Sequence, residues 1–108
     1  MLEGLLAAHR RYDELSAQLS QPDAAADMNR YRALMKEYKE LEPLSRQYLA
    51  LAAAEEALAE AKELLYSHDA ELSAMAAEQK AEAEQEIARL TEGARLMLLP
   101  HDPRDDRS

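Results

Sequence analysis

The side chains most able to do chemistry in this sequence are its three histidines, His9, His68 and His101. No two of them have the i, i+4 spacing that places a pair of metal ligands on one face of a helix. His9 falls on the apolar face of a predicted helix, which is typical of a core or boundary histidine. The sequence has no cysteine, which excludes thiolate nucleophiles and cysteine-based zinc sites. We therefore predict no metal site.

Carboxylates and glycines form no catalytic pattern either. Acidic pairs such as Glu55-Glu56 are frequent, but general acid and base catalysis needs carboxylates in a desolvated pocket that drives their pKa values apart. In an acidic helical chain, such runs more often form a solvated face. Gly4 and Gly93 are the two glycines, so no glycine-rich phosphate loop is possible, and Gly93 is expected to allow close packing or local fraying. We predict no catalytic residue and no cofactor.

The mixture of residues that best suits binding lies in the first half of the chain, where cations alternate with tyrosines. The candidate binding surface consists of Arg10, Arg11, Arg30, Arg32, Lys36 and Lys39. Together with Tyr12, Tyr31 and Tyr38, these side chains suit contact with RNA or an acidic protein. In the alternative interpretation, which we favour, the tyrosines belong to the core and the cations pair with carboxylates such as Glu14 and Glu37 at helical spacing.

Helices must position these side chains, because the composition excludes a sheet. The 108 residues include 22 Ala and 18 Leu, whereas Val, Phe, Trp and Cys are absent. Strands favour β-branched and aromatic residues, while Ala, Leu, Glu and Lys are strong helix formers. The net charge of −9 is uneven, with 7 basic and 8 acidic residues in 1–46 but 6 and 14 in 47–108. A phosphate backbone would repel the second half, so RNA contact is expected only in the first.

Apolar residues at steps of three and four predict three helices. The first stripe runs from Leu2 to Leu19 and ends before Pro22, after which Asp27 is a candidate N-cap. The second stripe covers residues 31–65. The third covers residues 72–97, and Ser67 or Asp69 can cap the helix that carries it.

Pro43 lies inside the second stripe, where it removes one helical hydrogen bond and clashes with the carbonyl of Lys39. The stripe nevertheless continues on both sides of Pro43. The residues around it include no Gly, Asn or Asp that could build a turn. We therefore predict one kinked helix rather than two helices joined by a loop.

The predicted fold is all-α, with a short N-terminal helix packed on a long antiparallel αα-hairpin. The second and third helices must turn back on each other because their connection is short. Leu44, Leu51, Leu58 and Leu65 fall seven residues apart and are expected to form the seam that the third helix covers. Residues 1–99 form the helical domain, and residues 100–108, which contain two prolines, are predicted to be a linker to a further domain that this chain lacks.

Several segments together resemble a known family. They are Arg11-Tyr12-Asp13-Glu14-Leu15, Arg30-Tyr31-Arg32-Ala33-Leu34, Lys36-Glu37-Tyr38, Glu40-Leu41-Glu42-Pro43-Leu44 and Leu98-Leu99-Pro100-His101-Asp102-Pro103-Arg104-Asp105-Asp106. The sequence resembles the N-terminal domain of the bacterial peptide chain release factor 1 family, the class I translation release factors. The resemblance covers essentially the whole chain, and the final segment is the most specific because it has no helical periodicity.

The resemblance implies a non-catalytic helical arm that reaches toward the stalk base of the large ribosomal subunit. In that family the linker leads to a Gly-Gly-Gln tripeptide that promotes peptidyl-tRNA hydrolysis, and to a Pro-x-Thr element that reads the stop codons UAA and UAG. Neither motif occurs in these 108 residues, so the fragment is not expected to be an enzyme. The resemblance also implies recycling by release factor 3, and modification of the missing Gln by the release-factor glutamine methyltransferase in the full-length protein.

Two other interpretations belong to different classes. The leucine stripes suit a stand-alone coiled-coil scaffold that self-associates, whereas we expect the fragment to be monomeric. An amphipathic arm on a membrane surface is disfavoured because acidic polar faces oppose binding to anionic lipid. No apolar run approaches the ~20 residues of a membrane span, and the N-terminus has no signal-peptide pattern. We therefore expect a cytoplasmic protein without a membrane partner.

Overall fold

A computed structural model describes residues 2–99 and confirms the all-α prediction. Its elements are the α-helices α1 (Leu2–Leu19), α2 (Met28–Leu64) and α3 (Ala70–Leu98), with a short 3-10 helix, η1 (Ala24–Ala26), between α1 and α2. The described residues contain no strand. The predicted linker, residues 100–108, lies outside them. None of the three α-helices in the described part is long and apolar enough to cross a membrane.

Aspartates begin the two long helices, as the sequence predicts. The carboxylate of Asp27 accepts a hydrogen bond from the Arg30 backbone N–H at 3.1 Å. At the start of α3, Asp69 accepts from the backbone N–H groups of Glu71 at 2.9 Å and Leu72 at 3.4 Å. These side chains satisfy donors that have no partner inside the helix.

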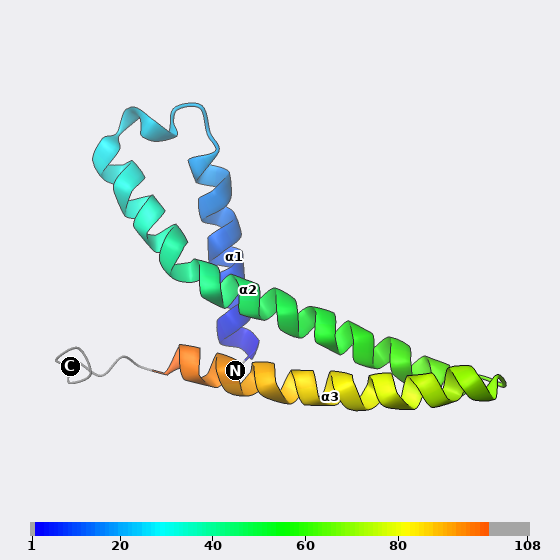
Figure 1. The fold of residues 1–108 in the computed structure, drawn as a ribbon. Helices are drawn as coiled ribbons and strands as arrows, with labels where there is room; N and C mark the ends of the chain where they lie inside the picture. Colours follow the sequence, from blue (N-terminus) through cyan, green and yellow to red (C-terminus); the bar gives the residue numbers. More distant parts are fainter. Residues whose placement is uncertain (1, 100–108) are drawn as a thin grey trace.

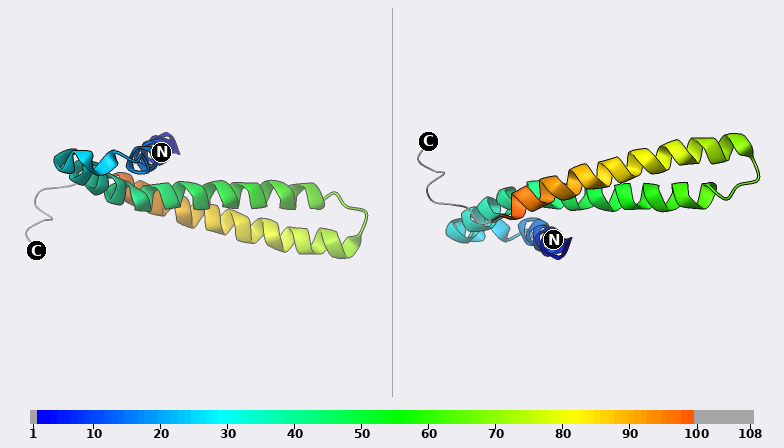
Figure 2. Two further views of the ribbon diagram at one scale, coloured as in Figure 1. Left: turned by 90° about the horizontal axis from the view of Figure 1, so that it is seen from above. Right: turned by 90° about the horizontal axis from the view of Figure 1, so that it is seen from below.

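The arrangement in space is two antiparallel helix pairs that share α2 (Figure 1). The first half of α2 packs along α1, and the second half packs along α3. Both views in Figure 2 place α1 and the connection after it at one end of the elongated α2–α3 hairpin. The described residues extend over 61 × 40 × 19 Å. The α2–α3 hairpin is therefore an arm that leaves a smaller α1–α2 body.

Pro43 lies within an unbroken α2, which confirms the prediction of a single helix through this position. The ribbon changes direction between the two halves of α2 (Figure 1). A proline inside a helix leaves the carbonyl four residues earlier without its usual donor and introduces a kink. Pro43 itself is exposed, so the bend is formed with the ring facing solvent.

All three helices meet in one small core. Leu5 of α1, Leu51 and Ala54 of α2, and Leu90 and Ala94 of α3 are buried together. The first helix therefore packs on the α2–α3 hairpin, as predicted. Burying large apolar side chains from three elements at one point stabilises the junction between body and arm.

Alanines form most of the seam farther along the hairpin. Ala61 of α2 and Ala76 and Ala83 of α3 are buried, whereas Leu58 and Leu65 are only half-buried. The predicted leucines therefore do lie between α2 and α3, and the buried alanines beside them allow the two helices to pack closely.

The predicted stripe of α3 is wrong at both ends, because Leu72, Met75 and Met97 are exposed. Alanines take the buried positions of the distal half instead. A close-packed alanine seam leaves no room for longer side chains, and these turn outward.

Gly93 of α3 marks a close approach to α2. A Cβ atom at this position would lie 2.9 Å from Nε2 of Gln47. That same Nε2 donates a hydrogen bond to the Leu90 carbonyl at 2.8 Å. Gly93 therefore makes room for a polar bridge between α2 and α3, which agrees with the packing role predicted for it.

Candidate functional site

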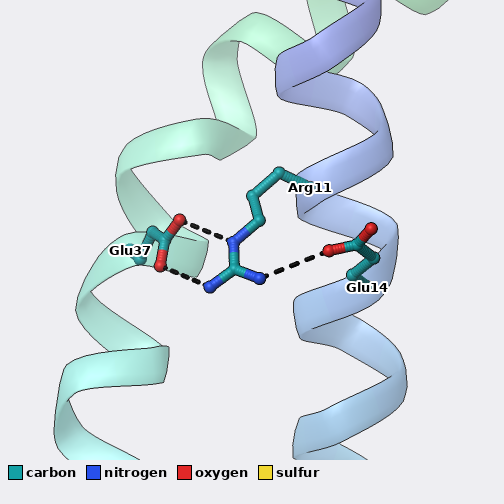
Figure 3. A network of polar contacts seen from close by, with 3 residues as sticks. All are labelled: Arg11, Glu14 and Glu37. Atoms are coloured by element: carbon teal, nitrogen blue, oxygen red, sulfur yellow. Dashed lines mark hydrogen bonds and ion pairs between the residues drawn. The ribbon is translucent and has the colours of Figure 1, made fainter.

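Arg11 is half-exposed and links α1 to α2 through carboxylates of the same chain (Figure 3). Its guanidinium donates two hydrogen bonds to the carboxylate of Glu37 on α2, at 2.8 and 3.0 Å, and one to Glu14 at 3.3 Å. Hydrogen bonding to Glu37 and then Glu14 raises the pKa of Arg11, and Arg11 in turn lowers the pKa of Glu37. For this cation the intramolecular pairing that we favoured from the sequence is found.

Three other predicted cations share one face of α2. Arg32, Lys36 and Lys39 follow one another at steps of four and three, so they project from the same side of the helix. All three are exposed, and no carboxylate among residues 2–99 lies within ion-pair distance of them. We call these three residues the basic cluster.

Arg10 and Arg30 do not belong to the basic cluster. Arg30 precedes Arg32 by two residues, which places it about 160° away around α2. Arg10 lies five residues from both buried leucines of α1, Leu5 and Leu15, so it points about 140° away from the face that packs on α2. The structure thus brings three of the six predicted surface residues together, and the binding role of all six stays a prediction.

Two pairs of aromatic rings pack between α1 and α2. Tyr12 and Tyr38 stack with ring centroids 4.3 Å apart, and His9 stacks on Tyr48 at 4.9 Å. Hydrogen bonding to Tyr38 raises the pKa of Tyr12 to about 12. These stacked pairs join α1 to α2, so one face of each ring is already occupied within the chain.

His9 takes the boundary role that the sequence predicts. Its Nδ1 lies 2.7 Å from the hydroxyl oxygen of the buried Ser45, and its Nε2 lies 3.3 Å from the carboxylate of Asp13. No cluster of three or more His, Cys, Asp or Glu side chains that could hold a metal occurs in the described part of the chain. The arrangement around His9 links α1 to α2.

The far end of the hairpin exposes apolar side chains that sequence reasoning missed. Tyr66 is 86% exposed in the turn after α2, Leu64 is exposed at the end of α2, and Leu72 is exposed in the first turn of α3. We call these three residues the tip patch. Its signal in the sequence is an aromatic residue at the break between two stripes, where no helix face needs it. Large apolar side chains exposed at one end of an elongated molecule are typical of a contact surface.

The comparisons with known proteins decide the family of this chain. The sequence pattern of the PCRF domain matches residues 8–108. The chain belongs to the PCRF domain family. Over its whole length this PCRF domain is 34% identical to peptide chain release factor 1 of Alkaliphilus metalliredigens (strain QYMF). It spans 31% of that relative's length. No solved structure gives a significant match.

Proposed function

We propose that this PCRF domain is the non-catalytic N-terminal arm of a release factor that terminates translation at UAA and UAG, and that it binds the ribosome at the large-subunit stalk base. The family match over residues 8–108 carries this proposal. Peptide chain release factor 1, the relative named above, is about three times as long as this chain. Peptide release is therefore proposed for the full-length protein, and positioning for this domain.

The shape of the domain supports a positioning role. The α2–α3 hairpin extends away from the α1–α2 body and ends in the tip patch with Tyr66 (Figure 1). A tyrosine ring gives a large contact area with few rotatable bonds to immobilise, which is why tyrosine is frequent at protein interfaces. We propose that the tip patch makes an end-on contact with the stalk base.

The basic cluster supports a second contact, with phosphates of ribosomal RNA. Arg32, Lys36 and Lys39 are exposed and have no internal partner among residues 2–99. Cations of this kind displace counterions from a phosphate backbone and so contribute salt-dependent affinity. The basic cluster lies in the body, whereas the tip patch lies at the end of the arm, so one domain can be held at two points.

The stand-alone scaffold is the weaker alternative because the leucine seam is used within the chain. Leu51 is buried against Leu90 and Ala94 of α3, and Leu58 and Leu65 are half-buried in the hairpin. A second copy would have to displace α3 to reach them.

Ribosome binding and peptide release test the proposal together. We expect the 108-residue chain to co-sediment with large ribosomal subunits and to release no peptide from ribosomes halted at a stop codon. Hydrolysis by this chain would contradict the non-catalytic role. Failure to bind isolated large subunits would contradict the positioning role.

Matched charge reversals test the basic cluster. The double variant R32E/K36E should weaken binding to large subunits, and its affinity should depend less steeply on salt, by about 0.7 to 0.9 in log–log slope for each lost phosphate contact. The variant R10E/R30E makes the same change of net charge at the two predicted cations outside the basic cluster, and weaker binding by R32E/K36E alone would confine the phosphate contact to the cluster. Equal weakening by both pairs would show a general charge effect and would refute the cluster.

The proposal includes two partners of the full-length factor. Release factor 3 is proposed to recycle it, and the release-factor glutamine methyltransferase to modify its Gly-Gly-Gln glutamine. This chain contains no Gly-Gly-Gln sequence, so we expect the purified methyltransferase to transfer no methyl group to it.

A further inference from the structure

A groove runs along one side of the α2–α3 hairpin. Ala54 and Ala57 of α2 and Ala83 of α3 line its apolar part. The alanines that bring the two helices together leave no long side chain to fill the space above them. The groove is therefore a shallow apolar channel parallel to both helices.

Two longer side chains, one apolar and one polar, line the groove toward the end of the hairpin. Leu64 lines it from α2, and Gln79 lines it from α3. Met75 lies one helical turn before Gln79 and is exposed on the same face of α3. Exposed leucine and methionine side chains beside an alanine channel suit an apolar partner surface, because methionine adapts to irregular shapes.

Glutamates border this channel. Glu60 of α2 and Glu82 of α3 are exposed and have no ion-pair partner within the described residues. Glu86 also borders it, and its carboxylate pairs with Arg89, which lowers the pKa of Glu86. Glu60 of α2 and Glu82 of α3 therefore leave two carboxylates at the groove without an ion-pair partner among the described residues.

We propose that this groove docks an amphipathic helix of a partner protein, whose apolar stripe fills the alanine channel and whose lysines or arginines pair with Glu60 and Glu82. A third helix here would cover the open side of a two-helix arm, which is the common way to bury an apolar helix face. Phosphates are repelled by the same carboxylates, so nucleic acid does not fit.

A second copy of this chain does not suit the groove. In a second copy, the cations that could pair with Glu60 and Glu82 are those of the basic cluster on α2, which have no ion-pair partner among residues 2–99. The apolar side chains of that half of α2, however, pack against α1. A copy could therefore supply the charges without the apolar side chains. The occupant must carry both on one helix.

A defined peptide tests the proposal on the 108-residue chain. The probe is a synthetic 18-residue amphipathic helix with leucines on one face and lysines on both flanks. Its control is an isomer of the same composition with the leucines dispersed around the helix. In a titration of the isotope-labelled chain by NMR, we expect the amphipathic peptide to shift amide signals around Ala57, Leu64 and Ala83, and the isomer to bind about tenfold more weakly.

Charge variants complete the test. The variant E60K/E82K should weaken binding of the amphipathic peptide about tenfold, because two attractive contacts become repulsive. The variant E56K/E63K makes the same charge change on α2 outside the groove and should weaken binding about twofold or less. Equal loss in both variants, equal binding of the dispersed isomer, or shifts centred on α1 would each overturn the proposal. All four substituted glutamates are exposed, and unchanged amide signals away from the mutations will confirm that the variants fold.

Discussion

Replacing Gly93 by alanine tests the close approach of α2 and α3 and gives a result whose sign depends on Gln47. An alanine in a helix interior is more favourable than glycine by about 1 kcal/mol. The new Cβ would lie 2.9 Å from Nε2 of Gln47 but 3.9 Å from its Cδ, so the amide end of that side chain must move while the rest can stay. Moving it breaks the 2.8 Å hydrogen bond to the Leu90 carbonyl.

The two effects of G93A nearly cancel. A hydrogen bond of this kind contributes about 0.5 to 1.5 kcal/mol net, and the Leu90 carbonyl keeps its place in the helix when Gln47 leaves. We therefore expect G93A to change the free energy of unfolding by less than about 0.5 kcal/mol, and Q47A to lower it by about 1 kcal/mol. In the Q47A background, G93A should raise it by about 1 kcal/mol, because nothing opposes the helix propensity of alanine.

Thermal and urea unfolding of the four proteins measure this cycle. A change of 1 kcal/mol corresponds to a Tm shift of about 4–8 °C for a domain of this size. Stabilisation of about 1 kcal/mol by G93A alone would show that the Gln47 bridge contributes nothing. Destabilisation by G93A in the Q47A background would show that the backbones themselves approach too closely for a methyl group. Either result would refute the explanation given for Gly93.

Three further outcomes are expected. L51A should lower the free energy of unfolding measured in a urea titration by about 2–5 kcal/mol, because Leu51 is 2% exposed at the junction of the three helices. Its control, L49A, should change this free energy by about 0.5 kcal/mol or less, because Leu49 is 53% exposed. Arg11 lowers the pKa of Glu37 from its usual 4.5, so this pair stabilises the fold fully above pH 4.5 and loses its contribution as the pH falls through the lowered pKa. In R11M, the urea midpoint of unfolding should therefore fall less steeply with pH below 4.5 than in the unmodified chain. An unchanged slope would contradict the pairing. P43A should straighten α2 and raise the radius of gyration measured by X-ray scattering above that of the unmodified chain, and an identical scattering curve would show that packing alone sets the bend.

The sequence was sufficient to predict the helices, because their ends are set by local chemistry. Asp27 and Asp69 cap helices where short polar segments interrupt the stripes, and these signals involve only neighbouring residues. Pro43 was also interpreted correctly, since the stripe continues across it and no turn residues surround it. Local propensity and apolar periodicity agree throughout this chain, which is why the fold class followed from them.

The sequence was less informative about which face each residue takes. Leu72 and Met75 are more apolar than Ala76, yet Ala76 is buried and they are exposed, because the small side chain is what allows the helices to approach. The sequence was equally uninformative about which cations of the candidate binding surface have a partner within the chain. Arg11 and Lys36 look alike in the sequence, but Arg11 finds Glu37 across the body, and only the fold brings those two positions together.

The bend at Pro43 gives the domain a mechanical property. From Pro43 to Leu64 the helix is about 32 Å long, so a change of about 10° at the bend moves the end of the hairpin by about 6 Å. The basic cluster lies before this pivot and the tip patch lies after it. A partner that binds both the basic cluster and the tip patch therefore favours one bend angle of α2, and its affinity for each surface depends on that angle. The bend at Pro43 therefore sets how far the tip patch lies from the basic cluster.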